Sequence, residues 1–209
     1  MMDLMEKQKI LKAILRDGTA SQLRNMLASG ARADFPYPGM GNNTPVHLAA
    51  FNKVPDKLQL LLNSLRKDPE RLKEALEATN DNGVTPLFEA VWVGRPPYAY
   101  AKEENPTPEQ LEKYKDMFYR KIENMPRTVE ILLDAGANVS STQKAYPGEK
   151  GGASYTVMEW LQEELSWQEN MPEEKDPKVK KALEDSLKII KQHEQRKILQ
   201  LNSHIASSR

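Results

Sequence analysis

The sequence predicts an all-α protein built from repeated pairs of helices, and three observations support this prediction. Residues 44–50 read TPVHLAA, and residues 85–91 repeat the pattern as TPLFEAV. Residues 23–31 read LRNMLASGA and are echoed by VEILLDAGA at residues 129–137. The 209 residues are 39% hydrophobic and 29% charged, a balance typical of a helical, surface-rich molecule with a thin core.

Each repeated segment has a local physical meaning. Threonine is a good N-cap, and proline fits the next position because its missing N–H is not needed in the first helical turn. Helices are therefore predicted to begin at Thr44 and Thr85, with a weaker copy at Thr156. Gly30 and Gly136 stand where a left-handed residue would end a second, leucine-rich helix. The repeated unit is thus a helix, a turn and a second helix.

This unit resembles the ankyrin repeat, whose period of about 33 residues holds a turn and two antiparallel helices. The match is close at residues 44–50 and at residues 136–138. The array is also similar to divergent ankyrin arrays with long insertions in bacterial proteins that are delivered into host cells. Terminal units that depart from the pattern are expected, because they face solvent on one side. The resemblance implies a solenoid of about four units within residues 1–165, near residues 5–34, 44–78, 85–139 and 156–165.

The spacing of the units predicts two insertions. Asp68-Pro69-Glu70-Arg71 indicates one more short helix, which ends near Ala78. Residues 95–125 form the larger insertion, and its first part, Arg95 to Tyr100, is expected to be extended because of its consecutive prolines. A capping box at Thr107 then predicts a helix, before the second helix of the unit begins near residue 129.

The apolar face of the inserted helix has two interpretations. It is formed by residues at helical spacing, namely Leu111, Tyr114, Phe118, Ile122 and Met125. Packing of this face on the stack is favoured, and presentation to a groove of a partner is the alternative.

Residues 166–209 are predicted to continue the stack as a polar loop and a capping helix. The loop covers Ser166 to Lys175, Asp176 and Pro177 start the helix, and the tail from Asn202 to Arg209 is expected to fray. An apolar stripe could close the open end of the stack, made of Val179, Leu183, Leu187, Ile190, Ile198 and Leu201.

Composition disfavours several functional classes. The 30 basic and 30 acidic residues give no net charge, which argues against nucleic acid or anionic lipid as a partner. The chain has no cysteine, so a reducing cytoplasm suits it, and this could be the host cytosol if the protein is delivered there. No apolar stretch reaches the roughly 20 residues that span a bilayer, and the first residues carry too many charges for a signal peptide.

No catalytic or metal-binding pattern is recognised, so we expect neither an enzyme nor a cofactor. His47, His193 and His204 lie far apart in the sequence, and the adjacent glutamates are expected to be solvated. By resemblance to the ankyrin family, His47 is expected to hydrogen-bond to neighbouring backbone and tie adjacent units together. An anion site near Lys144, Lys150, Gly151 and Gly152 is a minor alternative.

The resemblance implies a monomeric module that binds a protein partner through its concave face and loop tips. Phe51 and Trp92 follow the alanine-rich helices, and they are either exposed anchors or covered by Tyr98 and Tyr100. The alternative function is a secreted effector, or a targeting or inhibitory subunit, that regulates a host or partner enzyme. The expected partner-binding residues are Met40, Asn42, Asn43, Phe51, Asn52, Asn80, Asp81, Asn82, Trp92, Val93, Tyr98 and Tyr100.

Overall fold

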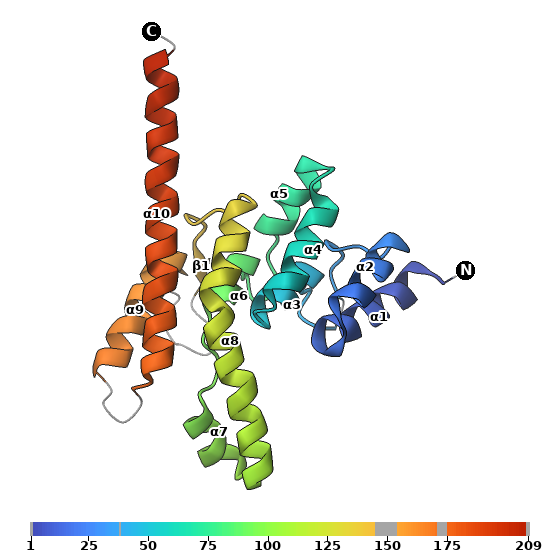
Figure 1. The fold of residues 1–209 in the computed structure, drawn as a ribbon, viewed down its shortest axis with the longest axis vertical. Helices are drawn as coiled ribbons and strands as arrows, with labels where there is room; N and C mark the ends of the chain where they lie inside the picture. The colour runs from blue at the N-terminus through green and yellow to red at the C-terminus, as the bar shows by residue number, and fades with distance from the viewer. Residues whose placement is uncertain (1, 38, 145–153, 171–174, 208–209) are drawn as a thin grey trace.

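The computed structural model describes residues 2–37, 39–144, 154–170 and 175–207. This part of the chain is helical apart from its loops and one pair of two-residue strands, which confirms the all-α fold class (Figure 1). The antiparallel strands are β1 (Gln143–Lys144) and β2 (Ser154–Tyr155). The helices are α1 (Leu4–Asp17), α2 (Ala20–Ala28), α3 (Pro45–Phe51), α4 (Pro55–Leu65), α5 (Pro69–Glu77), α6 (Pro86–Val91), α7 (Pro97–Glu104), α8 (Pro108–Asp134), α9 (Val157–Asn170) and α10 (Pro177–Ser207).

The helices form two layers that run side by side from the N-terminus to the C-terminus. In one layer α1, α3, α6 and α9 pack in succession, and in the other α2, α4, α8 and α10 do so. Each helix of the first layer also packs on its counterpart in the second. The N-terminal half of α8 projects from the stack together with α7, whereas the C-terminal half of α10 projects in the opposite direction (Figure 1).

One hydrophobic core joins these layers. Leucine and isoleucine side chains with 0% exposure lie in it along the whole stack, for example Leu11, Leu58, Ile122, Leu161 and Leu183. The small residues Ala49, Ala50 and Ala90 are equally buried, so the short helices α3 and α6 approach their neighbours closely.

The helix ends follow the predicted signals with one difference. Thr44 opens α3 with its hydroxyl accepting a hydrogen bond from the amide of His47, whereas Thr85 opens α6 without a side-chain cap. Gly30 and Gly136 have φ of 95° and 104°, a region that favours glycine. The same hydrogen bonds occur at both helix ends. The residue after each glycine donates its amide to a carbonyl of the preceding helix, for example Ala31 to Met26.

The larger insertion differs from the prediction in two ways. Residues 97–104 form α7 and are not extended, because Pro97 occupies the first helical position, where a proline is tolerated. The inserted helix and the second helix of the unit are also continuous, so that α8 has 27 residues with Pro126 inside it. Buried side chains lie on both sides of this proline, including Ile122 and Val129, and they hold both segments on the core.

The C-terminal part also corrects three expectations. Residues 166–170 belong to α9 and not to a loop, and helix α10 continues to Ser207 through most of the predicted frayed tail. The start of α10 and the buried Val179, Leu183 and Ile190 agree with the prediction. Ile198 and Leu201, however, are 57% and 62% exposed, because α10 extends beyond the helices that it packs on.

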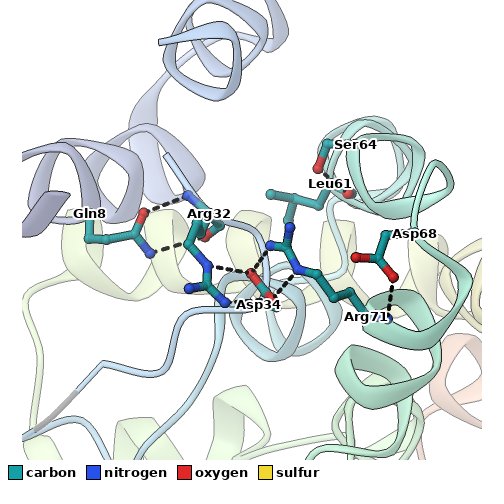
Figure 2. Close-up of polar contacts among 7 residues, drawn as sticks. All are labelled: Gln8, Arg32, Asp34, Leu61, Ser64, Asp68 and Arg71. Atoms are coloured by element: carbon teal, nitrogen blue, oxygen red, sulfur yellow. Dashed lines mark hydrogen bonds and ion pairs between the residues drawn. The ribbon is translucent and has the colours of Figure 1, made fainter. Parts of the chain in front are cut away.

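A polar network ties the first units together (Figure 2). Gln8 of α1 exchanges two hydrogen bonds with the backbone of Arg32, and Asp34 accepts hydrogen bonds from the guanidinium groups of Arg32 and Arg71. Burial would raise the pKa of Asp34, but the hydrogen bonds from both arginines outweigh it and hold that pKa well below its ordinary value. The loop after α2 is thereby joined to α1 on one side and to α5 on the other.

Replacing Asp34 with alanine should lower the free energy of unfolding by about 1–2 kcal/mol, because its charge-assisted hydrogen bonds to Arg32 in the same loop and to Arg71 of α5 are lost. Urea unfolding of the wild type and of the variant measures this loss. Asp17→Ala is the matched control. It breaks the exposed pair between Arg16 and Asp17, which should change stability by no more than about 0.5 kcal/mol. Equal losses in the two variants would contradict the bridging role of Asp34.

The two threonines that open α3 and α6 provide a paired test. Thr44→Val removes the capping hydroxyl at nearly constant shape and should cost about 1 kcal/mol. Thr85→Val should change stability by less than about 0.5 kcal/mol, because no helix amide depends on that hydroxyl. Thermal unfolding of both variants measures the difference, and a larger loss at Thr85 would mean that it caps α6 in solution.

Candidate functional site

Phe51 and Trp92 meet where two neighbouring first-layer helices end. Phe51 is the last residue of α3 and Trp92 follows α6, and their ring centroids lie 5.4 Å apart at an interplanar angle of 29°. Both side chains are partly exposed. Their exposure is therefore intermediate between the two predicted alternatives, an exposed anchor and a side chain covered by the insertion. The ammonium of Lys121, on α8, lies 4.4 Å from the centroid of the Phe51 ring.

Two buried titratable side chains, Lys53 and Glu89, influence each other's pKa next to these rings. Lys53 is 2% exposed, and its ammonium donates a 2.8 Å hydrogen bond to the backbone carbonyl of Trp92. Burial lowers the pKa of Lys53 to about 7, and the nearby charge of Lys121 acts in the same direction. Burial also raises the pKa of Glu89 to about 7, against the opposing effects of Lys53 and of a hydrogen bond from Asn80. These two groups are held inside the fold, where Lys53 fixes the turn after α3 to the end of α6.

A cleft of about 560 Å³ opens beside this pair, between the end of α1, the turn at residues 52–54 and the projecting half of α8. We call it the basic groove. Lys53 forms part of its floor, and Tyr100, Tyr114 and Met117 give it an apolar wall. Its charged lining consists of five basic residues and two acidic ones, namely Arg16, Lys53, Lys113, Arg120, Lys121, Asp17 and Asp116.

A second cleft, of about 640 Å³, lies between α7, α8, α9 and the start of α10. We call it the aromatic cleft. Tyr98 and Trp167 are 42% and 37% exposed in it, and Tyr119 donates a 2.7 Å hydrogen bond to the carboxylate of Asp176 at its rim. Burial raises the pKa of Glu164, another residue of this lining.

The loop tips of the two central units are bonded to each other. Asn42 donates a 2.6 Å hydrogen bond to the carboxylate of Asp81, and the Asp81 amide donates to the carbonyl of Gly41. The Asn80 side chain is buried, and its amide group donates to Asn43 and to Glu89. Asn80 therefore holds the tips together, while Asn42, Asp81 and Asn82 remain exposed at the surface.

His47 has the structural role that the resemblance implied. Its Nδ1 accepts a hydrogen bond from the amide of Thr44, and its Nε2 donates to the carbonyl of Val84 at 3.0 Å. These bonds require the neutral ring, and burial lowers the pKa of His47 to about 4. The side chain thus joins α3 to the loop that precedes α6.

The structure divides the predicted partner-binding residues among four places. Asn52 and Tyr100 line the basic groove, Val93 and Tyr98 line the aromatic cleft, and Phe51 and Trp92 form the stacked pair. The remaining six, which are Met40, Asn42, Asn43, Asn80, Asp81 and Asn82, belong to the loop tips. Lys150, Gly151 and Gly152, part of the alternative anion site, lie outside the described residues.

The basic lining of the groove was missed because the insertion carries equal numbers of acidic and basic residues. In the fold many of these charges pair locally, for example Arg95 with Glu103 and Glu104, or Lys115 with Glu112. Lys113, Arg120 and Lys121 form no ion pair within the described part of the chain. Their spacing of seven and eight residues is the signal that could have placed them on one face of a helix.

Comparison with known proteins does not assign the chain to a family. No family model matches the sequence, and no curated protein matches it. Among the described helices, none has the length and apolar character needed to cross a membrane. The described residues also hold no group of three or more His, Asp or Glu side chains that could bind a metal ion.

The buried neutral state of His47 predicts a specific dependence of stability on pH. The unfolded chain binds a proton at this residue near pH 6.5, but the folded chain does so only near pH 4, so stability falls as pH drops through this window. From pH 7 to pH 5 the wild type should lose about 2 kcal/mol more than the non-titrating variant His47→Gln. Urea unfolding at both pH values tests this, and parallel losses in the two proteins would show that His47 does not carry the effect.

Proposed function

We propose that this chain is a non-enzymatic protein-interaction module of the ankyrin type, which binds a partner protein through its concave face and loop tips. The two-layer packing of successive helix pairs supports this proposal, as do the matching starts of α3 and α6 at Thr-Pro and the matching glycine ends of α2 and α8. In such a stack each unit contacts only its neighbours, so the exposed side chains can serve recognition without disturbing the fold.

The observation that carries the proposal is the stacked pair of Phe51 and Trp92 beside the basic groove. Large aromatic side chains that stay partly exposed on rigid helices are frequent anchors of protein interfaces. Here they are held in place by Lys53, whose ammonium bonds to the Trp92 backbone, and by the ring contact of Lys121. A preorganised aromatic surface of this kind loses little conformational entropy when a partner binds.

The strongly perturbed titratable groups also fit a structural role. The Lys53 ammonium donates to the carbonyl of Trp92, the Glu89 carboxylate accepts a hydrogen bond from Asn80, and His47 is bonded to backbone on both sides of its ring. Each of these groups therefore makes contacts within the fold, and we assign none of them to catalysis.

The experiment is affinity capture with the whole chain, followed by mass spectrometry and calorimetry with the purified partner. Trp92→Ala should weaken binding by about 2 kcal/mol or more, because it removes an anchor of the interface. Its unfolding free energy should fall by less than the 3–5 kcal/mol typical of a fully buried tryptophan.

Ile198→Ala, which truncates an exposed apolar residue on the projecting part of α10, is the matched control and should leave binding unchanged. Wild-type affinity in Trp92→Ala, or the capture of small molecules or nucleic acid without any stoichiometric protein, would refute the proposal.

A further inference from the structure

We propose that the basic groove binds an acidic, extended segment of the partner protein, with an apolar side chain of that segment resting on Tyr100, Tyr114 and Met117. This inference rests on the proposed function and adds to it the chemistry of the partner. It follows from the unpaired charges of the groove, the partial burial of Lys121 and the spacing of the cations along α8.

The acidic residues of the groove do not neutralise all of its basic residues. Arg16 and Asp17 neutralise each other through an ion pair of 2.6 Å. Lys113, Arg120 and Lys121 have no such partner among the described residues, and Asp116 is the remaining acid of the lining. A chain with no net charge thus concentrates unpaired positive charge at one concave place, where carboxylates of a partner would be attracted.

Lys121 is in a setting that favours an incoming anion. Burial lowers the pKa of its ammonium, and the nearby Glu89 only partly opposes this effect. Its close contact is the ring of Phe51, and no carboxylate of the described residues lies within ion-pair distance. Because the ammonium has already lost part of its hydration, a carboxylate that reaches it gains more than it would at an exposed lysine.

The spacing of the cations suits an extended peptide. At a rise of about 1.5 Å per helical residue, Arg120 and Lys121 lie about 10–12 Å along α8 from Lys113. An extended chain rises about 3.3 Å per residue and alternates the direction of its side chains, so two acids four positions apart lie on the same side, about 13 Å from each other, and can meet these cations at once. Met117 lies between them in the sequence of α8 and lines the same groove. Together with the stacked rings of Tyr100 and Tyr114, whose centroids are 4.1 Å apart, it offers an apolar wall to a residue between the acids.

A peptide fits this groove better than nucleic acid does. Asp116 stands in the lining between the cations and would repel a continuous row of phosphates, whereas a peptide can place its acids at separate positions. The apolar wall can also contact a leucine or an aromatic side chain of a peptide.

The direct test uses fluorescein-labelled peptides and the whole chain, with binding followed by fluorescence anisotropy. The probe is a twelve-residue peptide of alternating glutamate and leucine blocks, and its controls carry glutamine or lysine in place of glutamate. We expect the acidic probe to bind at least tenfold more tightly than the glutamine peptide. Raising the salt concentration from 50 to 500 mM should weaken its binding at least fivefold.

Two variants assign this binding to the groove. The double variant Lys113→Glu with Arg120→Glu changes only exposed side chains and should weaken the acidic probe at least tenfold. Lys121→Met keeps an unbranched side chain over Phe51 but removes the charge, and it should weaken the probe several-fold. Lys188→Glu, at an exposed position of α10 outside the groove, is the matched control and should leave binding unchanged. Unfolding midpoints of all variants establish that they are folded.

The outcomes separate this inference from the proposed function. Acidic-probe binding that the double variant leaves intact would overturn the assignment to the groove. A captured protein partner that depends on Trp92, together with equal binding of all three peptides, would overturn the acidic segment but leave the interaction module. Tighter binding of a twelve-nucleotide oligo-dT than of the acidic peptide, with no protein partner captured, would overturn both.

Discussion

The stack exists because no pair of helices in this chain can bury its apolar faces alone. Helices as short as α3 and α6 have too few residues to be stable in isolation, so their stability must come from packing against neighbours in both layers. Burial alone does not fix how one pair sits on the next. Polar contacts between units supply that register. His47 reaches the carbonyl of Val84, and Asp34 reaches Arg71 of α5, each across more than 30 residues of sequence.

The need for polar contacts between neighbouring helix pairs also explains why a lysine is buried beside the candidate site. Withdrawing the Lys53 ammonium from water is costly, but it donates to the carbonyl of Trp92 and lies in the field of Glu89. The bond spans the junction of two units, so it positions the partly exposed Trp92 and the turn that forms the floor of the groove. The long helix α8 adds the opposite wall. Its second half belongs to the stack, and its first half, continuous with the second through Pro126, places Lys113 and Arg120 along the groove.

Local chemistry in the sequence was enough to predict much of this fold. The starts of α3, α5, α8 and α10 were placed within one residue, because a cap followed by proline leaves few conformations open. The same reasoning failed at α7, since proline at the first helical position and proline in an extended segment are locally alike. The predicted separation of the inserted helix from the helix near residue 129 was also wrong, because buried residues on both sides of Pro126 outweigh the loss of one helical hydrogen bond.

The candidate site was harder to predict because it depends on which charges find partners. Composition and net charge average over the whole chain, and a neutral insertion therefore gave no sign of a basic surface. In the fold Arg95 and Lys115 form ion pairs with glutamates, whereas Lys113, Arg120 and Lys121 form none within the part of the chain that the structure describes. The helical phase of these three residues was visible in the sequence, but the opposite wall was not, since Arg16 and Lys53 reach the groove only through the packing of α1 and α3. A surface assembled from several units becomes predictable only when the stack is known, and its net positive charge is a property of the fold.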